Sequence, residues 1–204
     1  MHEKPLVFFD PGQNQSVSDR ASLRESFVEG RLLRFDKPLK WTSFDVVNKI
    51  RSLLRHRLGI KKIKVGHAGT LDPLATGLLI ICTGAMTRRI DSFQAMEKQY
   101  SGSFRLGMTT PSFDLETEPD SQFPYEHIDE ALLHTLSRQF TGEQYQMPPQ
   151  FSARKIDGKR AYSFARRGEH TQLEPRQIHI HEFAITRIAL PDVYFRVRCS
   201  KGTY

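Results

Sequence analysis

The 204-residue sequence contains only two cysteines, Cys82 and Cys199, and a single tryptophan. Two cysteines cannot build the disulfide framework of a small secreted protein, and both lie in apolar or alternating segments that predict buried thiols. No C-x-x-C or H-E-x-x-H motif occurs. His179 and His181 stand two residues apart without a third ligand, so we expect no zinc site.

Long hydrophobic runs are also missing. No apolar stretch reaches the length that spans a membrane, and the first residues lack the charged, apolar and small-residue order of a secretion signal. We therefore expect a cytoplasmic protein that contacts no membrane. Hydrophobic residues make up 38% of the chain, which is enough for one good core and hence for one main domain.

Acidic residues are scarce in two parts of the chain. Residues 31–90 hold 13 Lys and Arg against 3 Asp and Glu, and residues 151–204 hold 11 against 5. The whole chain has a formal charge of +7 and a pI near 9.5. If these two basic parts share a face, they would attract a phosphate backbone; the alternative is an ordinary solvated surface on which cations happen to cluster.

The segment Val65–Leu79, V-G-H-A-G-T-L-D-P-L-A-T-G-L-L, combines reactive and conformationally restrictive residues. Its glycines permit unusual backbone angles, while Pro73 restricts the backbone on both sides of Asp72. A continuous apolar run, Leu78–Cys82, follows and predicts a strand buried on both faces. A carboxylate held in a rigid loop beside a strand could be a catalytic group. The alternative is an ordinary turn, since Asp-Pro is common in turns of glycine-rich segments.

Two helices are predicted from hydrophobic spacing. The first begins with Thr42 and Asp45 in a capping-box arrangement and carries an apolar stripe through Leu54. Its other face and the loop behind it are rich in Lys and Arg, which favours either an RNA-facing rim or a solvated helix face. The second helix covers Ile128–Phe140 and is expected to stop at Gly142.

Strands are predicted at Gly30–Pro38, at residues 98–107 and in a terminal hairpin formed by Ile178–Ile188 and Val193–Cys199. A further short helix is expected over residues 160–167. Residues 1–29 are polar and show no sustained period, which predicts a mobile extension.

Several of these segments resemble the motifs of one enzyme family. G-H-A-G-T-L-D-P-L-A-T-G, residues 66–77, resembles the signature of the TruB family of tRNA pseudouridine synthases. Four other blocks are similar to family motifs: G-R-L-L-R-F-D-K-P, K-Q-Y-S-G-S-F-R-L-G, M-P-P-Q-F-S-A-R-K-I-D-G and C-S-K-G-T-Y. The chain departs from the pattern at Lys40, where glycine is usual, which questions the local turn geometry.

The resemblance implies an α+β fold, the pseudouridine synthase catalytic fold, with a mixed and mainly antiparallel sheet flanked by helices over residues 30–204. Family members continue past Tyr204 into an Arg that pairs with the catalytic Asp, and often into a small RNA-binding domain. The catalytic domain is therefore expected to be truncated at its C-terminal end, without an appended RNA-binding domain.

The resemblance also implies an activity: isomerisation of the T-loop uridine of tRNA, position 55, to pseudouridine. Asp72 would be catalytic, while His67, Tyr100 and Tyr204 would bind the substrate. The expected partner is the T-arm of tRNA, the expected state is a monomer, and no cofactor or metal is expected.

Two other functions remain open from the sequence. Without the residues that follow Tyr204 in the family, the chain could be a non-catalytic RNA-binding fragment. A glycoside hydrolase would need a second acid as well framed as Asp72. The other candidates, Asp114, Glu116 and Asp157, lie in ordinary turn or loop contexts.

Overall fold

The computed structural model describes residues 17–149, 155–156, 159–160 and 173–204. The chain divides into two compact units, Met1–Gln94 and Ala95–Tyr204. We describe each unit by itself.

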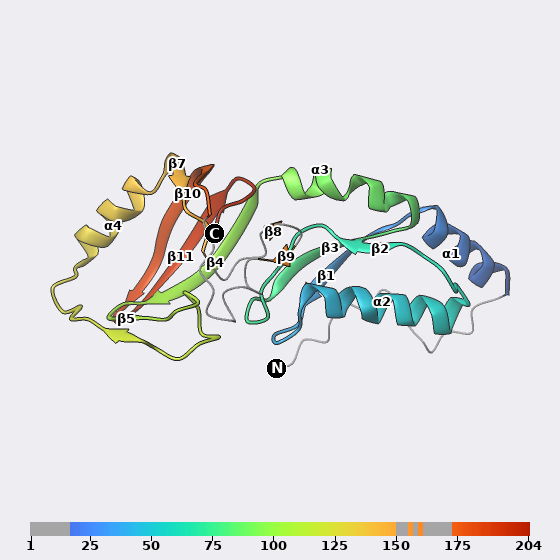
Figure 1. Cartoon of the computed structure of the whole chain (residues 1–204), viewed down its shortest axis with the longest axis horizontal. Helices are drawn as coiled ribbons and strands as arrows, with labels where there is room; N and C mark the ends of the chain where they lie inside the picture. Colours follow the sequence, from blue (N-terminus) through green and yellow to red (C-terminus); the bar gives the residue numbers. More distant parts are fainter. Residues whose placement is uncertain (1–16, 150–154, 157–158, 161–172) are drawn as a thin grey trace. The chain divides into compact units, whose positions relative to one another are not determined.

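The first unit is built on a three-stranded antiparallel sheet with the order β1-β3-β2. These strands are β1 (Leu32–Lys37), β3 (Gly77–Thr83) and β2 (Val65–His67). Helix α2 (Ser43–Leu58) runs alongside this sheet (Figure 1) and begins with the predicted capping box between Thr42 and Asp45. The predictions of the first strand, the central strand and the first helix are confirmed.

Helix α2 and strand β3 supply most of the core of this unit. The apolar stripe of α2, Val46, Val47, Ile50 and Leu54, is buried in one cluster with Leu79 and Ile81. The prediction that β3 is buried on both faces is wrong, because the Leu78 side chain is 64% exposed. Strand β2 pairs with β3 only from His67–Ile81 to Val65–Thr83, so the Leu78 end of β3 has a neighbour on one side alone.

Helix α1 (Val17–Glu29) lies inside the range predicted as a mobile extension, and the structure differs from the prediction there. The C-terminal end of this helix is tied to the sheet, since the Thr83 hydroxyl donates to the Phe27 carbonyl at 3.0 Å. Its sequence has no apolar stripe, so hydrophobic spacing gave no signal for it. Residues 1–16 lie outside the described part of the chain. A 3₁₀ helix, η1 (Gly84–Arg89), and α3 (Ile90–Ala95) follow β3.

The second unit contains a four-stranded antiparallel sheet with the order β4-β11-β10-β7. Its strands are β4 (Lys98–Arg105), β11 (Asp192–Cys199), β10 (Arg176–Ala189) and β7 (Gly142–Gln146). Helix α4 (Glu130–Gln139) packs beside β10 (Figure 1). The second helix, the strand from residue 98 and the terminal hairpin were all predicted correctly. Strand β7 was not predicted, because Gly142 was interpreted only as a helix stop.

Two short hairpins complete the described secondary structure: β5 (Met108–Thr109) with β6 (Ser121–Gln122), and β8 (Lys155–Ile156) with β9 (Lys159–Arg160). Apart from Arg160, the helix predicted over residues 160–167 lies outside the described residues. Ile178, Ile180 and Cys199 form the core of the second unit. Both cysteines are buried free thiols, as predicted. Among the described residues, no helix is long and apolar enough to cross a membrane.

Candidate active site

Asp72 is presented by the loop that joins β2 to β3, and its side chain is exposed. The backbone holds this loop in shape at both ends. The Ala68 amide donates to the Ile80 carbonyl at 2.8 Å, and the Ala75 amide donates to the Asp72 carbonyl at 3.0 Å. At the entrance to β3, the Gly77 amide donates to Oδ1 of Asp36 at 3.0 Å. The carboxylate of Asp72 is therefore displayed on a fixed turn.

Lys37, the last residue of β1, is buried beneath this loop, with only 1% of its surface exposed. Its Nζ donates to the carbonyls of Trp41 at 2.6 Å, Pro38 at 3.0 Å and Pro73 at 3.4 Å. Burial lowers the pKa of Lys37, while the negative charges of Asp72 and Asp45 oppose that shift. The ammonium group thus joins β1 to the residue after Asp72 and interacts electrostatically with the Asp72 carboxylate.

Ser43, the first residue of α2, holds the loop on the other side of Asp72. Its hydroxyl accepts from the Leu71 amide at 2.9 Å and donates to the Leu71 carbonyl at 3.2 Å. Neither Lys37 nor Ser43 was predicted as a site residue. The D-K-P block was a signal for Lys37, but nothing near Ser43 showed that its hydroxyl would reach a loop 28 residues away.

The family usually has glycine at the position of Lys40, and the structure shows that the chain keeps a glycine-like turn there. Its backbone has φ 67°, the left-handed conformation that glycine adopts most easily. Its amide donates to the Pro73 carbonyl at 2.7 Å, so this turn also supports the Asp72 loop. The chain keeps the turn that glycine would give and accepts the strain of a side chain there.

Replacing Lys40 by glycine is expected to stabilise the protein by about 0.5–1 kcal/mol, because a side chain in the left-handed region costs roughly 1–2 kcal/mol, partly offset by glycine's greater freedom in the unfolded chain. That gain corresponds to a melting temperature about 2 °C higher. Lys40→Ala is the matched control: it removes the same charge but keeps Cβ, so it should give no gain. A thermal unfolding scan in which glycine and alanine behave alike would show that the backbone is not strained here.

His67 ends β2 and pairs with Ile81 of β3, five residues before Asp72 in the same connection. The ring is half-buried, and its Nδ1 is hydrogen-bonded to the Gly69 carbonyl. Because a carbonyl can only accept, Nδ1 carries the hydrogen and donates it. That bond fixes the orientation of the ring and does not involve its other nitrogen, Nε2.

Tyr100 and Tyr204 belong to the second unit. Tyr100 lies on the edge strand β4 opposite Val197, and its side chain is 41% exposed. Tyr204 is 50% exposed, and the Gln146 side chain holds its backbone: Nε2 of Gln146 donates to the Tyr204 carbonyl and Oε1 accepts from the Tyr204 amide, both at 2.8 Å. The structure thus places His67 at the end of β2 and Asp72 in the loop that follows it, and it describes the two tyrosines within their own unit.

The exposed Asp72 carboxylate, which interacts electrostatically with the Lys37 ammonium, can act as a base or as a nucleophile. Among the described residues, no group of three or more His, Cys, Asp or Glu side chains could hold a metal ion. His179 and His181 share a strand face, as predicted, and their rings stack at 4.4 Å. Glu143 and Glu97 lie beside them, with Oε1 atoms 4.0 Å from Nδ1 of His179 and 3.2 Å from Nε2 of His181.

Two solved structures illustrate the fold that this chain shares. A crystal structure of a Cbf5-Nop10-Gar1 complex matches 96% of this chain and 46% of the solved chain, with a TM-score of 0.63 and 23% identity. The structure of an H/ACA RNP bound to a substrate RNA containing 2′-deoxyuridine matches 100% and 49%, with a TM-score of 0.59 and 20% identity. At such identities the likeness concerns the fold, and it confirms the predicted α+β class.

Sequence relatives are much closer. The tRNA pseudouridine synthase B of Flavobacterium johnsoniae is 59% identical over 181 residues, which are 88% of this chain and 79% of the relative. The enzyme of the same name from Phocaeicola vulgatus is 56% identical over 88% of this chain and 76% of its own length. The family model described as TruB family pseudouridylate synthase (N terminal domain) matches residues 55–204. The chain therefore belongs to the TruB family of pseudouridylate synthases.

Proposed function

We propose that the chain isomerises the T-loop uridine of tRNA, position 55, to pseudouridine, with Asp72 as the catalytic residue. The observation that carries this proposal is the display of the Asp72 carboxylate on a loop that Lys37 and Ser43 hold from two sides. Relatives that are more than half identical bear the name tRNA pseudouridine synthase B. A tRNA substrate makes the cytoplasm the expected compartment and a monomer the simplest active form.

The reaction is an isomerisation in which all atoms balance. The bond from uracil N1 to the ribose carbon breaks, the base turns, and C5 bonds to the same carbon. C5 then loses its hydrogen as a proton, and N1 gains one. Asp72 would act at the sugar, either as a nucleophile or as a stabiliser of a charged sugar, and a carboxylate could also accept the C5 proton. No electrons are exchanged, so the chemistry requires no redox cofactor.

The uridine is stacked inside the folded tRNA and must leave the stack before Asp72 can reach it. We assign His67 to opening the T-loop and filling the vacated space, Tyr100 to stacking on the extruded uracil, and Tyr204 to lining the pocket. The fixed ring of His67, five residues from Asp72, supports the first assignment. Tyr100 and Tyr204 are both partly exposed to solvent, which is consistent with contact to a base.

Replacing His67 by alanine should weaken tRNA binding and slow turnover, each by about tenfold, because about 1.4 kcal/mol of contact to the opened loop would be lost. His56→Ala, an exposed histidine on α2, is the control and should behave like the wild type. The measurements are tRNA affinity and initial rate. If both stay at wild-type values in His67→Ala, the assignment of His67 is wrong.

The proposed function is tested by incubating the chain with unmodified tRNA and mapping pseudouridine chemically along the RNA. We expect a single product site at the T-loop uridine and none in a tRNA that carries cytidine there. Tight binding without product would show the alternative, an RNA-binding fragment. Release of free uracil in place of pseudouridine would instead point to a hydrolase that cleaves the glycosidic bond.

A further inference from the structure

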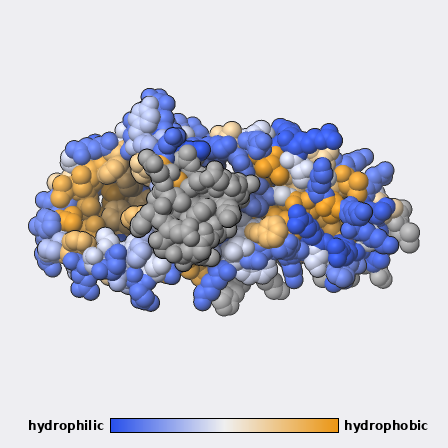
Figure 2. All heavy atoms as spheres, in the orientation of Figure 1, coloured by the Kyte–Doolittle hydropathy of each residue, from blue (hydrophilic) through white to orange (hydrophobic). Residues whose placement is uncertain are grey.

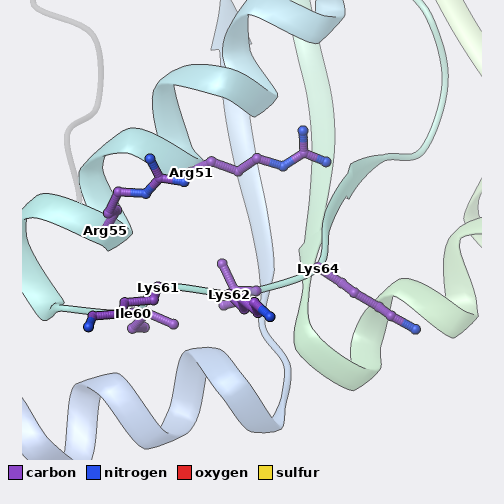
Figure 3. Close-up of a pocket in the computed structure, with 7 residues that line it drawn as sticks. Arg51, Arg55, Ile60, Lys61, Lys62 and Lys64 are labelled. Carbon is purple, nitrogen blue, oxygen red and sulfur yellow. The ribbon is translucent and has the colours of Figure 1, made fainter.

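A pocket of about 500 Å³ opens beside the C-terminal half of α2 in the first unit. Figure 3 shows side chains from α2 on one side of it and side chains from the loop between α2 and β2 on the other. Five of its seven lining residues are cations and two are isoleucines: Arg51, Arg55, Ile60, Lys61, Lys62, Ile63 and Lys64. None of the described residues that line this pocket is acidic.

The stretch of sequence that lines this pocket carries no acidic residue to balance its positive charge. The chain contains no Asp or Glu between Asp45 and Asp72, a stretch that holds seven Lys and Arg residues. Arg51 is held in place, since its Nη2 donates to the Val65 carbonyl at 2.8 Å and its guanidinium lies over the Phe44 ring at 5.6 Å. Within the described part of the chain, no ion pair neutralises the five cations. Like charges gathered in this way repel one another and attract a polyanion.

The surface around the pocket also fits a wet, polar ligand. Hydrophilic side chains dominate the visible side of α2, at the lower right of the space-filling view (Figure 2). The lysines of the pocket, Lys61, Lys62 and Lys64, are all exposed, while Ile60 is buried and forms part of the core beneath them. The packing of Ile60 therefore anchors the backbone of the loop that carries these lysines.

Helix α2 connects this pocket to the candidate active site. Ser43, at the start of α2, is bonded to Leu71 beside Asp72, and Arg55 lies twelve residues further along the helix. A rise of 1.5 Å per residue separates the two ends by about 18 Å. A ligand atom in the pocket therefore belongs to a part of the RNA other than the uridine at Asp72. Resting on the proposed function, we propose that this pocket binds a backbone phosphate of the tRNA, away from the nucleotide that is isomerised.

The chain offers a matched pair for the test. Arg55 and Arg57 are both exposed and both lie in the last turn of α2, so each contributes alike to the helix dipole, but only Arg55 lines the pocket. The double variant Arg55→Ala with Lys62→Ala should bind tRNA at least tenfold more weakly than the wild type. The slope of log K against log salt should become shallower by about 1, the change expected for one lost phosphate contact.

Arg57→Ala should keep the affinity and the salt slope of the wild type, and the melting temperatures of all variants should agree. If the single variants Arg57→Ala and Arg55→Ala lost affinity equally, the effect would depend only on total charge. That result would overturn the proposed phosphate site. An unchanged affinity in the double variant would overturn it as well. Because affinity is measured without turnover, a chain that binds tRNA but forms no pseudouridine would refute the proposed function while leaving this test intact.

Discussion

Asp72→Asn is expected to lower the rate of pseudouridine formation by at least ~10⁴-fold, the loss typical of removing a group that reacts directly with the substrate. Asparagine has the size of aspartate, so the loop contacts through the backbone amides of Ala68 and Ala75 should survive. The amide can neither attack the sugar carbon nor balance a positive charge there. The measurement is the single-turnover rate at saturating tRNA.

Binding of tRNA to Asp72→Asn should be at least as tight as to the wild type, because the substitution removes one negative charge next to a polyanion. The matched control is Asp114→Asn, which removes an acid from a loop of the second unit where it accepts from the Ser112 hydroxyl at 2.6 Å. That variant should retain full activity. If the two variants lost activity equally, Asp72 would have no special role. That result would favour the alternative of a glycoside hydrolase, in which two acids act as a pair.

Lys37→Met is expected to lower kcat by about 100-fold, because a displacement of the reactive group by about 1 Å can cost that much. Methionine fills a similar volume but cannot donate, so the carbonyls of Trp41, Pro38 and Pro73 would lose their shared partner. The carbonyls of Pro73 and Pro38 would keep the amides of Lys40 and Trp41 as donors, but the loss of hydrogen bonds to a charged group should still cost about 1.5–3 kcal/mol in the free energy of unfolding. Both quantities are measurable, by turnover well below the melting temperature and by denaturant unfolding.

Lys49→Met, on the exposed side of α2, serves as the control for the loss of a lysine charge and should change neither quantity appreciably. The two measurements together distinguish a role of Lys37 in stability from a role in positioning the Asp72 loop. If Lys37→Met is destabilised but keeps its kcat within twofold, the lysine only supports the fold. If kcat falls while tRNA affinity stays constant, Lys37 positions the loop that carries Asp72.

The sequence predicted most elements whose stabilisation is local. The capping box at Thr42 and Asp45 and the apolar stripe through Leu54 depend on residues three or four apart, so α2 could be recognised from its own sequence. The terminal hairpin was recognisable for the same reason, since its two strands alternate around one turn. Helix α1 escaped because it lacks an apolar stripe and is anchored by Thr83, 56 residues from Phe27.

The contrast between local patterns and long-range contacts also applies to the candidate site. Motifs pointed to Asp72, His67, Tyr100 and Tyr204 as candidate site residues, but not to the contacts that hold them. The bond from Ser43 to Leu71 and the clamp of Gln146 on Tyr204 join residues 28 and 58 positions apart. The buried ammonium of Lys37 is another such contact, since its three acceptors come from two segments. Pairings of this kind follow from the tertiary fold and leave no periodic trace in the sequence.

The most direct test of the central claim uses tRNA that carries tritium at C5 of its uridines. Pseudouridine formation replaces the C5 hydrogen by the bond to the ribose, so each isomerised uridine must release its tritium to water. We predict that the chain releases the tritium of one uridine per tRNA, at the T-loop position, and that Asp72→Asn releases none above background. Release from Asp72→Asn at the wild-type rate would contradict the account, because the carboxylate could then not be the reactive group.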